Sequence, residues 1–164
     1  MDYAELVCAS NFFFQSGASH PEDLVARAQS LGYTALALTD EASVSGNVRA
    51  HLAGQATGLP IVHGAQFVID QGPRLAFLAQ DKRGWQQLCR LITLGRRRAD
   101  KGHYQVFQDD LTNQSLDGCW AIWLPSAMAA ETSLHATGQW LKACLGERLW
   151  MGVSLQLRAD DRAW

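Results

Sequence analysis

The chain has 164 residues, of which 48% are hydrophobic and 18% charged, a composition that fits one globular domain and excludes a disordered tail. Its 14 lysines and arginines against 16 aspartates and glutamates give a net charge of −2. That balance argues against a stand-alone nucleic-acid-binding protein, which is normally basic. The longest uncharged apolar stretch, residues 118–130, is too short to cross a bilayer and contains Pro125.

The N-terminus and the cysteines both indicate a cytoplasmic protein. Asp2 and Glu5 stand where a secretory signal would carry basic residues. The cysteines are widely spaced and form no Cys-x-x-Cys pair, which is typical of reduced, buried thiols. We therefore expect no disulfide and no contact with a membrane. The four residues concerned are Cys8, Cys89, Cys119 and Cys144.

Apolar runs alternate with helical patterns from the start of the chain. Residues 3–9 predict a strand, and a loop follows it. Ser19 and Glu22 have the spacing of a capping box, in which each side chain accepts a hydrogen bond from the backbone N–H of the other residue. Gly32 would end the helix that they begin. Residues 33–38 predict a second strand, buried on both faces as in a parallel sheet.

The middle of the chain predicts a helix, a strand and a hairpin. The helix covers residues 45–57, and Pro60 opens a third strand. Residues 65–69 and 75–79 are two further apolar runs. Residues 70–73, Asp-Gln-Gly-Pro, separate them and have the composition of a tight turn. These two runs are therefore expected to pair as an antiparallel hairpin.

The second half predicts two long helices and two strands. The helices cover residues 81–97 and 133–145, and the strands cover residues 119–124 and 149–157. The first helix is expected to bury the face formed by Trp85, Leu88, Cys89 and Ile92. Residues 159–164 resemble the opening turn of another helix, so we expect the chain to be part of a longer protein. The order of elements predicts an α/β fold, either barrel-like or doubly wound.

Five phrases of the sequence follow one another in a recognisable order. They are residues 10–17, 35–41, 58–67, 75–85 and 88–93. Together they resemble the amino-terminal PHP (polymerase and histidinol phosphatase) domain of bacterial C-family DNA polymerases. Residues 19–28 and 91–99 are most similar to the error-prone, damage-tolerant branch of these enzymes. The resemblance covers almost the whole chain.

The resemblance implies a distorted β/α barrel of about seven strands. Residues 1–164 would form an incomplete PHP domain, with the first four to five strands and one hairpin. The polymerase domains that carry nucleotidyl transfer would be absent from this chain. The segment therefore holds no complete catalytic set, although the full-length relative is a DNA-directed DNA polymerase.

An active PHP site binds two or three divalent metals through His, Asp and Glu side chains at the carboxyl ends of its strands. The resemblance implies that the family carries an H-x-H pair where this chain has Val7 and Ala9, and a histidine where it has Glu41. It also implies a family aspartate where this chain has Ser16 and a family glutamate where it has Gln66. We therefore expect a vestigial pocket with no metal, no cofactor and no catalytic residue. Its positions are Val7, Ala9, Ser16, Asp40, Glu41 and Gln66.

Asp40 and Glu41 are the two carboxylates left in that pocket. Successive side chains of a strand point to opposite faces, so the pair is not expected to hold one ion. Asp40 is instead expected to accept backbone N–H groups from the loop or helix that follows. The histidines have neither H-x-H nor i, i+4 spacing, so we expect them to be surface or core residues. They are His20, His51, His63, His103 and His135.

The basic residues gather at the end of the helix over residues 81–97. Arg96, Arg97, Arg98 and Lys101 form this cluster. We interpret it as a solvated helix end that favours the helix dipole. The alternative is contact with nucleic-acid phosphates or with the polymerase body.

The resemblance implies a structural role in an error-prone DNA polymerase of DNA damage tolerance and repair synthesis. The segment would pack against the remainder of the polymerase chain, and DNA would be contacted through the absent domains. Two alternatives stay open: a PHP-type metal-dependent phosphoesterase or 3′–5′ exonuclease, and a stand-alone binding module. An incomplete barrel also leaves an uncovered strand edge, so we expect self-association of the isolated segment.

Overall fold

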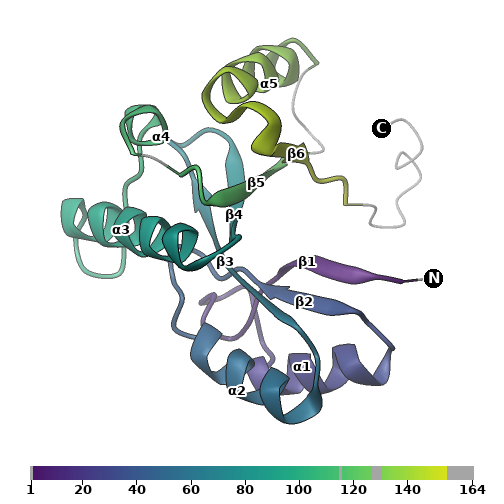
Figure 1. Cartoon of the computed structure of the whole chain (residues 1–164). Coiled ribbons are helices and arrows are strands. Elements are labelled where there is room, and N and C mark those ends of the chain that lie inside the picture. The colour runs from purple at the N-terminus through teal and green to yellow at the C-terminus, as the bar shows by residue number, and fades with distance from the viewer. Residues whose placement is uncertain (1, 115, 127–130, 155–164) are drawn as a thin grey trace.

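The structure, a computed structural model, describes residues 2–114, 116–126 and 131–154. Within these ranges six strands form one sheet in the order β1-β2-β3-β4-β5-β6 (Figure 1). They are β1 (Ala4–Cys8), β2 (Ala35–Leu38), β3 (Ile61–Val68), β4 (Arg74–Ala79), β5 (Cys119–Leu124) and β6 (Leu149–Met151). The pairings β3–β4 and β4–β5 are antiparallel and the other three are parallel.

The helices cover one face of this curled sheet. They are α1 (Pro21–Ser30), α2 (Asn47–Thr57), α3 (Lys82–Arg98), α4 (Gln108–Asn113) and α5 (Glu131–Leu145), followed by a short 3₁₀ turn, η1 (Gly146–Arg148). Figure 1 shows α1 and α2 beside β1 to β3, α3 along β3 and β4, and α5 beside β5 and β6. The predicted α/β class and partial-barrel shape are confirmed, with six strands where four to five were expected. No helix in the described ranges is long and apolar enough to cross a membrane.

Alternation along the strands separates two apolar faces. The helix-covered face buries Phe67, Phe77 and Leu91 beneath α3 and α5, and a second cluster beneath α1 and α2 contains Val25 and Leu38. The opposite, concave face carries a smaller cluster. Its buried members are Ala37, Ala76, Leu78 and Ile122, with Val7, Val62 and Leu124 packed against them. The largest side chains thus hold the helices, and the concave face is lined by smaller ones.

The start of α1 differs from the expected capping box. The N-cap residue is His20 and no side chain caps the helix, so the predicted Ser19–Glu22 exchange is wrong. The backbone carbonyl of Ser19 instead accepts from Asn11 N–H at 2.8 Å, which closes the preceding loop. Pro21 fixes the first helical φ angle, so the helix can begin there without a side-chain cap.

Strand boundaries depart from the prediction in two places. The two apolar runs expected on either side of Gly64 are one continuous strand, β3, because glycine there lets the backbone of β4 approach. A Cβ on Gly64 would lie 2.6 Å from the carbonyl oxygen of Phe77. The expected strand over residues 149–157 ends at Met151, where Gly152 N–H bonds to the Trp123 carbonyl. Residues 155–157 and the expected helix start at 159–164 lie outside the described residues.

Two helices also differ from expectation. The sequence predicted no helix at α4, a polar segment whose apolar residues are too few to show a period. In α3 the buried face includes Leu88 of the predicted face but not the other three residues. Trp85, Cys89 and Ile92 are half-buried, and the buried residues are Gly84, Gln87, Leu88, Leu91 and Gly95. Glycines at two positions of this face allow close backbone contact, which hydrophobicity alone does not reveal.

Gly84→Ala tests that close contact. Alanine is normally the better helix former by about 1 kcal/mol, so an ordinary helical site would gain stability. Here the new Cβ would lie 1.9 Å from the carbonyl oxygen of Gly118, which is backbone and cannot rotate away. We expect urea unfolding to show a loss of about 2 kcal/mol. Gln86→Ala, at an exposed position of the same helix, is the control and should change stability little; a stabilised Gly84→Ala variant would contradict the packing.

Candidate functional site

The ends of β1 and β2 and the middle of β3 meet at one place, where the sequence placed its pocket. Thr39 N–H donates to the Cys8 carbonyl at 2.8 Å, and Gln66 N–H donates to the Asp40 carbonyl at 3.0 Å. A parallel bridge between Glu41 and Gln66 extends the β2–β3 pairing beyond the end of β2. The structure therefore brings together the strand positions that the resemblance implied.

Asp40 is fully buried, and Ser10 occupies both oxygens of its carboxylate. Ser10 donates its backbone N–H to Oδ1 and its hydroxyl to Oδ2, each at 2.7 Å. Burial raises the pKa of Asp40, and the two hydrogen bonds from Ser10 offset part of that rise. Asp40 was expected to accept from the loop or helix that follows it, and that prediction is wrong, because both donors belong to Ser10 in the loop before α1. Asp40 therefore ties the β1 end to the β2 end.

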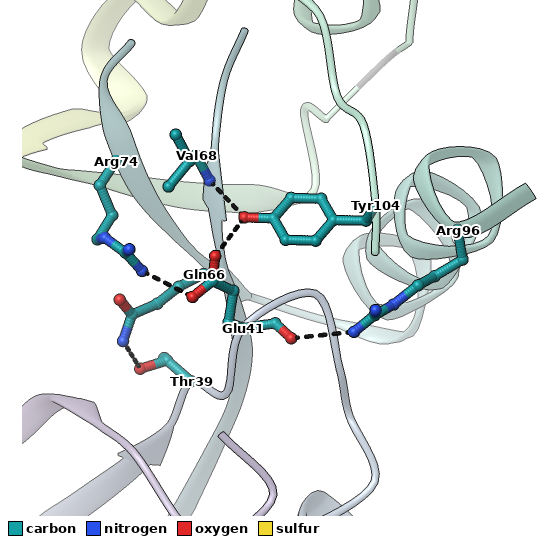
Figure 2. Close-up of polar contacts among 7 residues, drawn as sticks. All are labelled: Thr39, Glu41, Gln66, Val68, Arg74, Arg96 and Tyr104. Atoms are coloured by element: carbon teal, nitrogen blue, oxygen red, sulfur yellow. Dashed lines mark hydrogen bonds and ion pairs between the residues drawn. The ribbon is translucent and has the colours of Figure 1, made fainter. Parts of the chain in front are cut away.

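Glu41 is held by a tyrosine and an arginine from distant parts of the chain (Figure 2). The hydroxyl of Tyr104 donates to Oε1 at 2.6 Å, and Arg74 on β4 forms an ion pair with Oε2 at 3.2 Å. The same hydroxyl accepts from Val68 N–H at 2.9 Å. Burial raises the pKa of Tyr104, and the hydrogen bond to the Glu41 carboxylate raises it further. Both oxygens of Glu41 thus have partners within the chain.

The backbone after Glu41 is strained and is also held by an arginine. Ala42 is buried and has a positive φ of 44°, a conformation that residues other than glycine rarely adopt. Arg96 on α3 donates to the carbonyls of Ala42 at 3.2 Å and of Glu41 at 3.4 Å. Arg96 was expected in a solvated cluster, but its guanidinium faces this turn and lies 5.6 Å from the ring centre of Tyr104.

The remaining predicted positions lack strong metal-binding groups. Gln66 is buried and donates its amide to the Thr39 hydroxyl at 3.1 Å. Val7 packs in the small apolar cluster of the concave face, and Ala9 follows β1 with only a methyl side chain. Ser16 lies exposed in the loop before α1. The side chains at the ends of β1 and β2 and in the middle of β3 therefore contact other groups of the chain.

His63 forms a separate arrangement between α2 and α3. Its Nδ1 lies 2.9 Å from Asn47 Oδ1, and its ring contacts His51 and Trp85 with centroids 5.4 and 5.5 Å away. Burial lowers the pKa of His63, and the neighbouring His51 lowers it further. These side chains line a cavity of about 570 Å³. Only two imidazoles meet here, on the outer side of the sheet.

A metal centre needs several donor side chains around one point. Among the residues that the structure describes, no three His, Cys, Asp or Glu side chains gather closely enough to hold an ion. Near the strand ends the two carboxylates face different partners, as the alternation of strand side chains predicts. The residues present at this place do not fit a PHP-type metal cluster.

The curled sheet with helices on its outer side defines a partial β/α barrel with its candidate site at the strand ends. The PHP domain model matches residues 5–143, and the chain belongs to the PHP domain family. Error-prone DNA polymerases of Pseudomonas paraeruginosa and Methylococcus capsulatus are 51% and 47% identical to it over 98% and 97% of its length. The chain spans about 15% of the length of these relatives.

Solved structures agree on the fold. An amidohydrolase from Chromobacterium violaceum, with bound sulfate and no metal, has a TM-score of 0.68 at 16% identity and covers 98% of this chain and 80% of its own. A candidate metal-dependent phosphoesterase from Bifidobacterium adolescentis has a TM-score of 0.62 at 11% identity and covers 85% of this chain and 74% of its own. At such identities the likeness concerns the fold alone.

The sequence did not point to Ser10, Arg74 or Tyr104. Their partners lie 30 to 63 positions away along the chain, so no local spacing links them. A serine, an arginine and a tyrosine also have ordinary solvated roles. Arg74 reaches the site from strand β4, and Ser10 and Tyr104 reach it from loops, so only the tertiary fold brings them together.

Tyr104→Phe tests the contact that holds Glu41. The variant leaves Val68 N–H and Glu41 Oε1 each short of one partner, so we expect a loss of about 1 to 3 kcal/mol at neutral pH. Because the pKa of Tyr104 is raised in the folded chain, its contribution is complete below about pH 10 and is lost as the pH rises further. Urea unfolding at pH 7 and pH 10.5 should show a smaller gap between wild type and variant at the higher pH. A gap that grows with pH would contradict the contact.

Proposed function

We propose that this chain is the PHP part of an error-prone DNA polymerase and contributes structure instead of metal-dependent hydrolysis. The observation that carries the proposal is the state of Glu41, whose charge is met by Arg74 and Tyr104 from the same chain. A guanidinium beside this carboxylate would repel a divalent cation placed there. Each carboxylate oxygen of Glu41 already has a partner in the chain, so neither requires a metal ion as one.

The donor chemistry supports the same conclusion. Zinc and manganese sites are built from imidazoles and carboxylates. Val7 and Ala9 offer hydrocarbon where the family has two imidazoles, and Gln66 offers a neutral amide already bonded to Thr39. Without a bound ion, no water is acidified and no phosphate is clamped for hydrolysis. The proposal therefore treats all six predicted pocket positions as vestigial.

A structural role needs a surface for the remainder of the polymerase. At the β5–β6 end of the sheet, Trp120 and Trp150 are 39% and 61% exposed, with ring centroids 6.3 Å apart. Met151 and Val153, next in the chain, are also exposed, at 59% and 55%. Exposed aromatic groups at a sheet edge favour coverage by another part of a protein. We propose that the rest of the polymerase chain covers this edge, and that the protein acts in the bacterial cytoplasm during DNA synthesis on damaged templates.

Restoring three of the family's metal-binding side chains tests whether these positions alone account for the proposed loss of hydrolysis. The triple variant Val7→His, Ala9→His and Gln66→Glu restores three donors but leaves Glu41 paired with Arg74. We expect no hydrolysis of p-nitrophenyl phosphate or of a 3′-labelled oligonucleotide above wild type, in zinc or manganese buffers. Circular dichroism would confirm that the variant is folded. Metal-dependent hydrolysis by wild type itself would favour the phosphoesterase alternative and overturn the proposal.

Self-association tests the apolar edge. The double variant Trp120→Ser and Trp150→Ser removes the two exposed rings of the edge without touching the buried core. We expect light scattering of the wild-type chain to show concentration-dependent association, and the double variant to remain monomeric over the same range. Phe14→Ser is the matched control, because Phe14 is 82% exposed but lies in the loop before α1. Equal association of all three proteins would show that the chain does not associate through the edge that carries Trp120 and Trp150.

A further inference from the structure

Helix α3 carries a stripe of three basic and two neutral polar residues on the side opposite its buried face. Lys82, Gln86, Arg90, Thr93 and Arg97 follow one another at spacings of four, four, three and four residues, and all are exposed. This spacing keeps them within one side of a helix. At 1.5 Å per residue the stripe is about 22 Å long.

The cations of this stripe are not used by the fold. Among the described residues Lys82, Arg90 and Arg97 have no ion-pair or hydrogen-bond partner through their side chains. By contrast, Arg98 pairs with Asp110 at 2.5 Å and Arg83 pairs with Asp117 at 2.7 Å. The structure thus divides the basic residues of α3 into a set that serves the fold and a set that remains available.

Positive charge is concentrated on α3. Lys82 and Arg83 follow the N-cap residue Asp81, whose carboxylate accepts from Gly84 N–H at 2.8 Å, and the last turn carries three arginines, which the helix dipole favours. Six of the 14 cations of the chain lie on α3, which has no acidic residue. The other eight cations and all 16 carboxylates lie elsewhere in the sequence. A nearly neutral chain therefore presents one strongly basic helix.

A polar hollow lies beside the centre of the stripe. It has a volume of about 540 Å³. The described residues that line it are Arg83, Gln86, Gln87, Arg90, Asn113 and Gln114. None of them is a carboxylate or a hydrocarbon side chain, and the carboxylate of Asp117 is bonded to two of them, Arg83 and Gln87. Guanidinium groups bind phosphate, and side-chain amides bond to sugars, phosphates and base edges.

We propose that this stripe and its hollow bind the phosphate backbone of DNA. Its length equals the rise of about six base pairs along the axis of a duplex. A DNA strand suits the site better than an acidic peptide, because the amide groups can donate to sugar and phosphate oxygens between the charged contacts. The inference goes beyond the proposed structural role: DNA would be contacted by this domain itself, and not only by parts of the polymerase outside this chain.

The experiment compares two variants of equal net charge. The stripe variant carries Lys82→Gln, Arg90→Gln and Arg97→Gln. The control carries Arg27→Gln, Arg49→Gln and Lys142→Gln, on helices α1, α2 and α5. Binding of the 164-residue chain to a fluorescein-labelled primer–template duplex is followed by anisotropy over a series of salt concentrations. A poly-glutamate peptide serves as competitor, and thermal melting checks the fold of each variant.

We expect the stripe variant to bind at least tenfold more weakly at low salt and to melt close to wild type, since the three replaced side chains are exposed. The helix-dipole effects of losing Lys82 at one end of α3 and Arg97 at the other oppose each other. Its salt slope should fall by about two to three, the value for three lost phosphate contacts. The control should stay within about twofold of wild type. Equal weakening in both variants, absence of binding by wild type, or equal competition by poly-glutamate would overturn the proposal. None of these outcomes depends on metal-dependent hydrolysis, so the structural proposal is tested separately.

Discussion

The carboxylate of Glu41 is the group on which the arrangement of the strand ends depends. A carboxylate at a half-buried position must be paired, because its desolvation is costly without a positive or hydrogen-bonding partner. In this chain the partners are Arg74 from β4 and Tyr104 from the segment between α3 and α4. One charge thus fixes the end of β2 against a hairpin and a loop that are distant in sequence.

The same interaction explains why several neighbouring features have the form that they do. The Tyr104 hydroxyl donates to Glu41 and also accepts from Val68 N–H, and the centre of its ring lies 6.1 Å from that of Phe67. Arg96 supports the strained turn at Ala42 by binding the two carbonyls around it. In our proposal, guanidinium groups and a hydroxyl organise this site where a metal ion would organise that of the family. Such a site can be rigid without being catalytic.

Much of the fold follows from the sequence because its signals are local. The period-two and apolar runs located most of β1, β2, β4 and β5, and Gly32 and Gly58 end their helices in left-handed conformations. Errors arose where tertiary contact decides the outcome. Gly64 lies within β3 because the backbone of β4 occupies the space that a Cβ would fill. Gly84 likewise lets the backbone of α3 approach that of Gly118. Hydrophobicity counts neither glycine as a core residue.

The candidate site was predictable only in part, for a similar reason. The sequence could show that Val7, Ala9 and Gln66 are poor donors, since this is a property of each side chain alone. It could not show that Ser10 donates hydrogen bonds to both oxygens of Asp40, or that Arg74 forms an ion pair with Glu41. These contacts depend on how the strands and loops are arranged in the fold. The basic cluster at the end of α3 was likewise treated as a unit. In the structure Arg96 and Arg98 face the protein, and Arg97 faces solvent.

The most direct test is the metal content of the chain, purified without an affinity tag or chelator and measured by inductively coupled plasma mass spectrometry. If internal arginine and tyrosine contacts stand in place of a metal centre, zinc, manganese and iron together should amount to far less than one ion per chain. They should remain so after dialysis against each metal. Two or more tightly held ions per chain would contradict the central claim.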